Sequence, residues 1–226
     1  MSGPGGRGVA AARGLVIFDC DGVLVDSMAI DMRELTRAIA AAGGTMTAAE
    51  VDAAFHGVAL ADIQQGVEAH LGRPLPDAWM ERFLADRAAA FERQLQPIPG
   101  ARAALDGVRG AGWEACITSG GAHAKMELTL RLAGLLDAVP ADRIFSAYDV
   151  ARPKPAPDLF LHAAALCGFA PEACVVVEDS VPGVVAGLAA GMRTLAYSGG
   201  DAAAAERLAP LGAEPLADLR ELPARL

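Results

Sequence analysis

The fold of this chain is decided by residues 15–24, Leu-Val-Ile-Phe-Asp-Cys-Asp-Gly-Val-Leu. The apolar run ends in two acids, Asp19 and Asp21, that stand one residue apart. It predicts a buried parallel strand with a charged carboxyl end, which is where open α/β sheets place their ligand sites. Two carboxylates there cost free energy unless a cation or a hydrogen-bond network compensates them. The motif therefore indicates a site for a hard cation such as Mg²⁺, with a turn-capping acid beside a solvated one as the alternative.

A block of helices follows this strand directly. Helical patterns lie at 28–42, 48–55, 60–71 and 77–95, and no strand pattern interrupts them. Asp26 and Ser27 are expected to form a turn and an N-cap rather than to act in catalysis, and Gly43 and Gly44 should stop the first helix. The proline- and glycine-containing segment 97–100 marks the return of the chain. We therefore expect an all-helical insert that can close over the sheet edge as a lid.

Helix and strand alternate beyond residue 100. Strands are expected at 113–118, 143–146, 173–178 and 193–197, and helices at 101–109, 123–132, 158–167 and 182–190. This alternation predicts the α/β class, with a doubly wound parallel-sheet (Rossmann-like) core that carries an inserted all-helical cap domain. We expect residues 1–12 to be a flexible extension, 13–27 and 97–226 the core, and 28–96 the cap. The Ala/Leu-rich segment 201–226 is expected to end in edge helices.

Four polar clusters each end or closely follow an expected strand. They are Asp19 with Asp21, the run Thr118-Ser119-Gly120-Gly121, Lys154 between two prolines, and Glu178-Asp179-Ser180. Because the carboxyl ends of parallel strands lie along one edge of the sheet, these clusters should converge. Acids for a metal, a hydroxyl with backbone amides for phosphate oxygens, and one fixed cation suit phosphoryl transfer.

With these four motifs in this order, residues 14 to about 200 resemble the haloacid dehalogenase (HAD) superfamily. The similarity is to the subgroup with an α-helical cap inserted after the first motif, and it implies a Mg²⁺-dependent phosphatase. In this family Asp19 would be the nucleophile that forms an aspartyl-phosphate, and Asp21 the general acid and then the base. From the residues alone, Asp19 could instead be only a metal ligand and Asp21 only a turn former.

The resemblance also implies how the phosphoryl group is bound. Thr118 would bind a phosphoryl oxygen with help from the amide of Ser119, and Lys154 would bridge the nucleophile and the phosphoryl group. Gly22 and Gly120 complete the expected substrate-binding backbone next to these motifs. A local strand-ending role for Thr118 and an ordinary solvated position for Lys154 remain the alternatives.

The implied Mg²⁺ ligands are Asp19, Asp21, Glu178 and Asp179. Asp21 would use its backbone carbonyl, and Asp179 would bind the ion directly. Glu178 would bind it directly or through water, since adjacent side chains on a strand point to opposite faces. Cys20, between the two acids of the first motif, should face away from them.

The substrate is expected to be set by the cap. In the similar β-phosphoglucomutases, an arginine for a second phosphate and a histidine occupy positions that correspond here to Leu60 and Asp31, which weakens a mutase interpretation. The runs 55–63, 122–126, 145–150 and 155–163 look closer to sugar-phosphate phosphatases of the 6-phosphogluconate phosphatase kind. His56, His123 and Lys125 could then meet a polyol or carboxylate tail, with a solvated surface position as the alternative for each.

Two further classes of protein share part of this chemistry. A receiver-like module that only becomes phosphorylated would use the same acids and Mg²⁺, but it has no use for a helical cap or for Asp21. A dehalogenase uses an aspartate nucleophile but needs no metal, so Asp21 and the Glu178–Asp179 pair argue against it. The residues therefore favour a phosphatase, with a phosphosugar mutase as the alternative.

Composition limits the partners of this chain. Its 226 residues are 53% hydrophobic and carry a formal net charge of −9, which argues against nucleic acid or an anionic membrane as partner. Its four cysteines lack zinc-site spacing, no apolar run reaches the length of a membrane span, and residues 1–12 lack the apolar core of a signal peptide. We expect a cytoplasmic enzyme, monomeric or weakly homodimeric, whose partner is a small phosphate ester.

Overall fold

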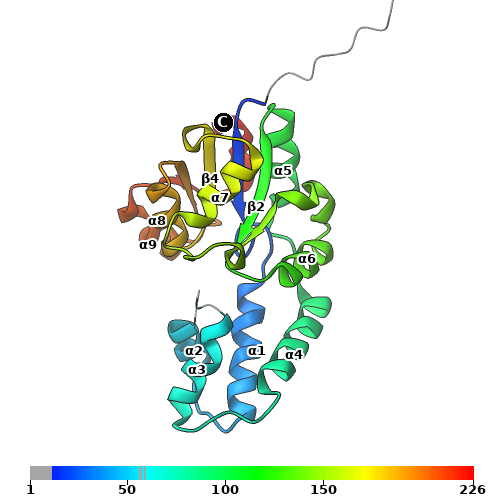
Figure 1. Ribbon diagram of the computed structural model, residues 1–226, viewed down its shortest axis with the longest axis vertical. Coiled ribbons are helices and arrows are strands. Elements are labelled where there is room, and N and C mark those ends of the chain that lie inside the picture. Colours follow the sequence, from blue (N-terminus) through cyan, green and yellow to red (C-terminus); the bar gives the residue numbers. More distant parts are fainter. Residues whose placement is uncertain (1–11, 56–57, 59) are drawn as a thin grey trace, which may run out of the picture.

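A single parallel sheet forms the centre of the computed structural model, which describes residues 12–55, 58 and 60–226 (Figure 1). Its strands in the described part of the chain are β1 (Leu15–Asp19), β2 (Glu114–Ser119), β3 (Ile144–Ser146), β4 (Cys174–Glu178), β5 (Arg193–Tyr197) and β6 (Glu214–Leu216). They lie in the order β3-β2-β1-β4-β5-β6, and all neighbours are parallel. Because β1 lies between β2 and β4, the residues that follow these three strands meet at one edge.

Helices cover both faces of the sheet. Those that follow its strands in the chain are α5 (Ala101–Gly110), α6 (His123–Leu132), α7 (Asp158–Cys167), α8 (Val181–Ala189) and α9 (Ala202–Leu208). Side chains of α5 and α6 share one apolar cluster with Val16 and Phe18 of β1. Those of α7 and α8 share a second with Leu15 and Ile17. Successive residues of β1 thus enter opposite cores, which explains why its apolar run is uninterrupted.

The described residues of the segment after β1 form four helices with an apolar core of their own. They are α1 (Met28–Ala41), α2 (Ala48–Phe55), α3 (Leu60–Leu71) and α4 (Trp79–Gln94). Leu35 and Ile39 of α1 pack in this core with Trp79 of α4, whose indole nitrogen donates to the carbonyl of Ala38 at 3.0 Å. Figure 1 shows these helices, the cap, beyond the edge of the sheet where β1 and β2 end.

The chain crosses between core and cap twice, and the two crossings lie side by side. The amide of Asp26 donates to the carbonyl of Gln96 at 3.0 Å, and the amide of Ile98 donates to that of Leu24 at 2.9 Å. Val25 and Pro97 form an antiparallel bridge between them. The cap is therefore joined to the core by a paired two-stranded connection rather than by two independent linkers.

The predicted fold class is confirmed, with one correction at the end of the chain. Segment 201–226 contains α9 and ends in a 3-10 helix over Leu219–Arg225, in agreement with the expected edge helices, but it also supplies the edge strand β6, which the sequence did not predict and whose Leu216 is fully buried. This strand spans only three residues and contains Pro215, which is tolerated at a sheet edge, so it leaves no periodic pattern. The exact domain boundaries stay a prediction, and nearly all of segment 1–12 lies outside the described residues. None of the described helices is long and apolar enough to cross a membrane.

Candidate active site

Asp19 is the last residue of β1 and lies beside Thr118 of β2. Its side chain is buried, and its Oδ1 accepts a hydrogen bond from Lys154 Nζ at 2.5 Å. Burial raises the pKa of Asp19 well above its usual range, although the Lys154 ammonium acts in the opposite direction. The neighbouring acids Glu178 and Asp179 raise this pKa further. An additional cation would therefore stabilise the ionised form that a nucleophile requires.

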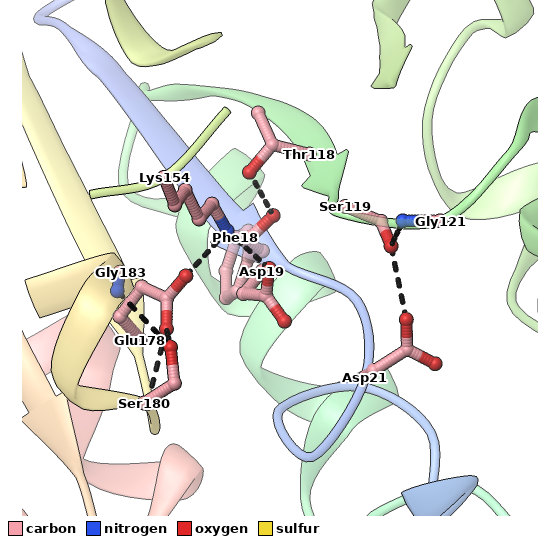
Figure 2. A network of polar contacts seen from close by, with 10 residues as sticks. All are labelled: Phe18, Asp19, Asp21, Thr118, Ser119, Gly121, Lys154, Glu178, Ser180 and Gly183. Carbon is pink, nitrogen blue, oxygen red and sulfur yellow. Dashed lines mark hydrogen bonds and ion pairs between the residues drawn. The ribbon is translucent and has the colours of Figure 1, made fainter. Parts of the chain in front are cut away.

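Glu178 and Asp179 lie next to Asp19 at the end of β4. Carboxylate oxygens of the three acids lie within 4.8 Å of one another. Glu178 also accepts hydrogen bonds from Lys154, and from the Ser180 amide and hydroxyl at 3.1 and 2.9 Å (Figure 2). Burial, reinforced by Glu178, raises the pKa of Asp179 to about 7. Lys154 pairs with Asp19 and Glu178, and the partly buried Asp179 adds a third acid beside them, so this group has more negative than positive charge.

Two glycines make room for these acids. A Cβ atom on Gly22 would lie 1.9 Å from Oδ2 of Asp179, and Gly22 has a φ of +81°, which side-chain-bearing residues rarely adopt. A Cβ atom on Gly183 would lie 1.9 Å from the carboxyl carbon of Glu178. The oxygen-only donor set of Asp19, Glu178 and Asp179 suits a hard cation such as Mg²⁺. These residues fit the expected ion.

The Asp21 carboxylate lies apart from this acidic group. Its Oδ2 accepts a hydrogen bond from Ser119 Oγ at 2.9 Å, and its Oδ1 accepts from Lys125 Nζ at 2.7 Å and from the Ser27 hydroxyl. Figure 2 shows Asp21 turned toward Ser119 rather than toward Lys154. Burial alone would raise the pKa of Asp21, but the Lys125 charge and these donors outweigh it, so the pKa is lowered. Its expected metal contact through the backbone carbonyl stays a prediction.

The end of β2 supplies hydroxyls and amides. Thr118 is fully buried, and its hydroxyl donates to the carbonyl of Phe18 at 3.4 Å. The Ser119 hydroxyl accepts from the Gly121 amide at 2.9 Å while it donates to Asp21. The expected contact with a phosphoryl oxygen uses the backbone amide of Ser119, so it does not compete with the hydrogen bond from the Ser119 hydroxyl to Asp21. The space around Gly120 is open, since a Cβ atom there would meet nothing within 4 Å.

The three residues expected near the substrate tail have different positions. Lys125 is not a solvated surface residue, because its side chain is only 12% exposed and its ammonium contacts Asp21 and Asp31. His123 is half exposed, and its Nε2 lies 2.9 Å from a carboxylate oxygen of Asp149. His56 lies outside the described residues. Of the two described residues, Lys125 belongs to the central cluster, where it pairs with the acid Asp21 of the protein itself.

Two contributors to the site differ from the sequence interpretation. Ser27 occupies the N-cap position of α1, but its side chain makes no capping hydrogen bond and donates to Asp21 instead. Asp31 was noted only as a departure from the mutases, yet it contacts Lys125 at 3.0 Å. The rarity of lysine could have pointed to Lys125, because the chain has 17 arginines and only two lysines. Both lysines, Lys125 and Lys154, lie on acids of the first motif.

Comparisons with known proteins agree with this geometry. A family model described as haloacid dehalogenase-like hydrolase matches residues 14–191. The chain is 36% identical over 183 residues to the 6-phosphogluconate phosphatase of Escherichia coli (strain K12), covering 80% of this chain and 81% of that protein. It is 34% identical to hexitol phosphatase A of the same strain, covering 80% and 82%. A solved HAD family hydrolase from Deinococcus radiodurans R1, with bound phosphate and sodium, matches with a TM-score of 0.73 at 32% identity, covering 94% of each chain.

Proposed function

Because this chain belongs to the haloacid dehalogenase-like hydrolase family and is a phosphatase, we propose that it hydrolyses a small phosphorylated sugar, sugar acid or polyol. The proposed reaction depends on Mg²⁺ and passes through an aspartyl-phosphate on Asp19. The observation that carries the proposal is the separation of two acids within one motif. Asp19 lies in the metal-type group with Lys154, whereas Asp21 is held apart by neutral hydroxyls and Lys125.

In the first step an oxygen of Asp19 attacks phosphorus, and the bond between phosphorus and the ester oxygen breaks. The mechanism requires Asp21, whose pKa is lowered in the ester-free chain, to be protonated in the enzyme–ester complex. The leaving oxygen takes this proton and departs as the free alcohol, so Asp19 becomes aspartyl-phosphate. Lys154, 2.5 Å from Asp19, keeps the nucleophile oriented and offsets charge on the phosphoryl group. The Thr118 hydroxyl and the Ser119 amide are assigned to the phosphoryl oxygens.

In the second step water replaces the alcohol. Asp21 takes a proton from the water as its oxygen attacks phosphorus, and the bond to Asp19 breaks to release inorganic phosphate. Asp19 returns to its carboxylate form and Asp21 is again protonated, so the cycle balances. Asp19, Glu178 and Asp179 would hold Mg²⁺, with the Asp21 carbonyl as a further ligand. When bound, the ion supplies positive charge that lets an anionic ester approach these acids.

The substrate class is supported by the relatives and by one position in the cap. Two relatives carry names of a sugar-acid phosphatase and a hexitol phosphatase. A mutase must hold a second phosphate in its cap, for which a bidentate arginine is well suited, and the corresponding position here is Leu60. Water is therefore the proposed acceptor of the phosphoryl group.

A panel of phosphate esters tests this proposal. Phosphate release is measured with Mg²⁺ from sugar, sugar-acid and polyol phosphates, with and without excess chelator. We expect release from at least one of these esters, its loss on chelation and its return with added Mg²⁺. Full activity in metal-free buffer would contradict the metal assignment. β-Glucose 1-phosphate with a trace of the 1,6-bisphosphate is a separate arm, in which rapid glucose 6-phosphate formation with little free phosphate would identify a mutase.

A further inference from the structure

Lys125 of α6 lies, largely shielded from solvent, between an acid of the core and an acid of the cap. Its Nζ is 2.7 Å from Asp21 Oδ1 and 3.0 Å from Asp31 Oδ2. The exposed fractions of the Lys125, Asp21 and Asp31 side chains are 12%, 14% and 10%. Little water therefore reaches these groups to compensate their charges if one contact is lost. One ammonium thus joins the loop after β1 to the cap helix α1 through α6.

The surroundings hold this lysine in one place. Its Cδ lies close to Gly121, where an added Cβ atom would stand 3.1 Å away, and its ammonium lies 5.8 Å from the centre of the Phe91 ring on α4. Arg87 of α4 lies 3.5 Å from Asp31 Oδ1, an ion-pair distance at which this oxygen accepts no hydrogen bond, so its charge reaches Asp31 from the cap side without a direct bond. Lys125 is therefore fixed by both domains and is not extended toward a substrate tail.

The charges explain why a cation is needed between these acids. Ser27 and Ser119 donate to the Asp21 carboxylate, but both are neutral and cannot offset the charge of Asp31. Without Lys125, two buried carboxylates would face each other across the domain junction and repel. The chain uses arginine for 17 of its 19 Lys and Arg positions, yet a lysine stands here, where a compact ammonium can touch two carboxylates at once.

We propose that Lys125 is a positioning residue that sets the orientation of Asp21 and is itself oriented by Asp31 of the cap. The inference rests on the proposed function, because it assumes that Asp21 transfers protons. It makes the placement of the acid and base dependent on a residue of the cap that does not touch Asp21. A small rotation of the Asp21 side chain would move its carboxyl oxygen out of hydrogen-bond distance of the reacting oxygen. Both steps would then slow, because proton transfer requires that distance.

The test compares Lys125→Met, Asp31→Asn and the double variant by steady-state kinetics. Two substrates are used: a sugar-acid phosphate that the wild type hydrolyses, and a short alkyl phosphate without a tail. Lys125→Met should lower kcat about 100-fold on both substrates, with KM changed less than about threefold. Asp31→Asn should lower kcat about tenfold, and the double variant should be no slower than Lys125→Met alone. Glu34→Gln, which alters another buried carboxylate of α1 paired with Arg37, is the matched control and should leave kcat unchanged.

Each other outcome decides against the proposal. A rise in KM confined to the sugar-acid phosphate would show that Lys125 binds the substrate, and additive losses in the double variant would show that Asp31 acts independently. If Lys125→Met does not fold, as judged by thermal melting, Asp31→Asn carries the test, and equality with Glu34→Gln overturns the inference. A wild type that hydrolyses no ester overturns the proposed function together with this inference, whereas an active wild type matched by Lys125→Met overturns this inference alone.

Discussion

Two buried lysine–carboxylate clusters, one within the core and one between core and cap, make a direct comparison. The core cluster contains Asp19, Glu178 and Asp179 with Lys154, which pairs with the first two, so three acids face one cation. The junction cluster contains Asp21 and Asp31 with Lys125 and Arg87, so its charges balance. The difference indicates which cluster could hold a metal ion. An added cation would stabilise the ionised acids of the core cluster, whereas the junction cluster already contains two cations of the protein.

The largest effect is expected where the core cluster loses its nucleophile. Asp19→Asn keeps the shape of the side chain but removes the charge that attacks phosphorus, so turnover should fall roughly 10⁴-fold or more. The measurement is phosphate release at saturating ester, with the fold checked by circular dichroism. Asp106→Asn, which alters an exposed acid paired with Arg102, is the control and should retain full activity. Substantial turnover by Asp19→Asn would remove the core cluster from the chemistry.

A pH-dependent response to Mg²⁺ would sharpen the comparison further. Burial and Glu178 raise the pKa of Asp179 from 3.8 to about 7, so the metal-free folded chain holds this proton more tightly than the unfolded chain does. This group therefore favours folding below about pH 4, and its contribution is lost as pH rises toward 7. Because Mg²⁺ competes with the proton, its stabilisation should grow as pH rises through about 7.

Thermal melting with and without excess Mg²⁺ measures this response. The increase in Tm caused by Mg²⁺ should be larger at pH 8 than at pH 6. Asp179→Asn should remove most of the difference between the two pH values, because the amide cannot bind the proton. An equal increase at both pH values would mean that no proton is displaced from the core cluster by the ion.

The smallest effect is expected at one hydroxyl of the junction cluster. Ser27→Ala removes one of three donors to Asp21, so kcat should fall about three- to tenfold and stability by about 1 kcal/mol. Asp201→Ala is the contrasting variant, because Asp201 does cap its helix by accepting from the Ala204 amide at 2.9 Å. It should cost about 1 kcal/mol with kcat unchanged. Equal kcat values for these two variants would show that Ser27 has only a structural role.

The core cluster could be predicted because each of its parts follows a strand. Asp19, Glu178 and Asp179 end or follow apolar runs, and parallel strands bring their carboxyl ends to one edge. Their predicted proximity is confirmed, as is the alternating fold around them. The catalytic roles and the ion stay predictions.

The junction cluster could not be predicted in the same way. Asp31 and Arg87 lie on cap helices whose packing against α6 depends on tertiary contacts rather than on periodicity. Ser27 matched the N-cap pattern, yet its hydroxyl bonds the Asp21 carboxylate instead of capping α1. The sequence pattern alone does not show which of these two hydrogen bonds forms. The short strand β6 was missed for a related reason, since three residues beside a proline carry no alternation.

Because Val25 and Pro97 pair where the chain enters and leaves the cap, the cap is an insert that another block of helices could replace. Its two ends already lie side by side, so a different helical block could replace it without separating β1 from the rest of the sheet. If the cap sets the substrate preference, as expected from the sequence, this preference could change while the core is retained. Under the proposed role of Lys125, a replacement block would also have to supply an acid at the position where Asp31 now pairs with Lys125.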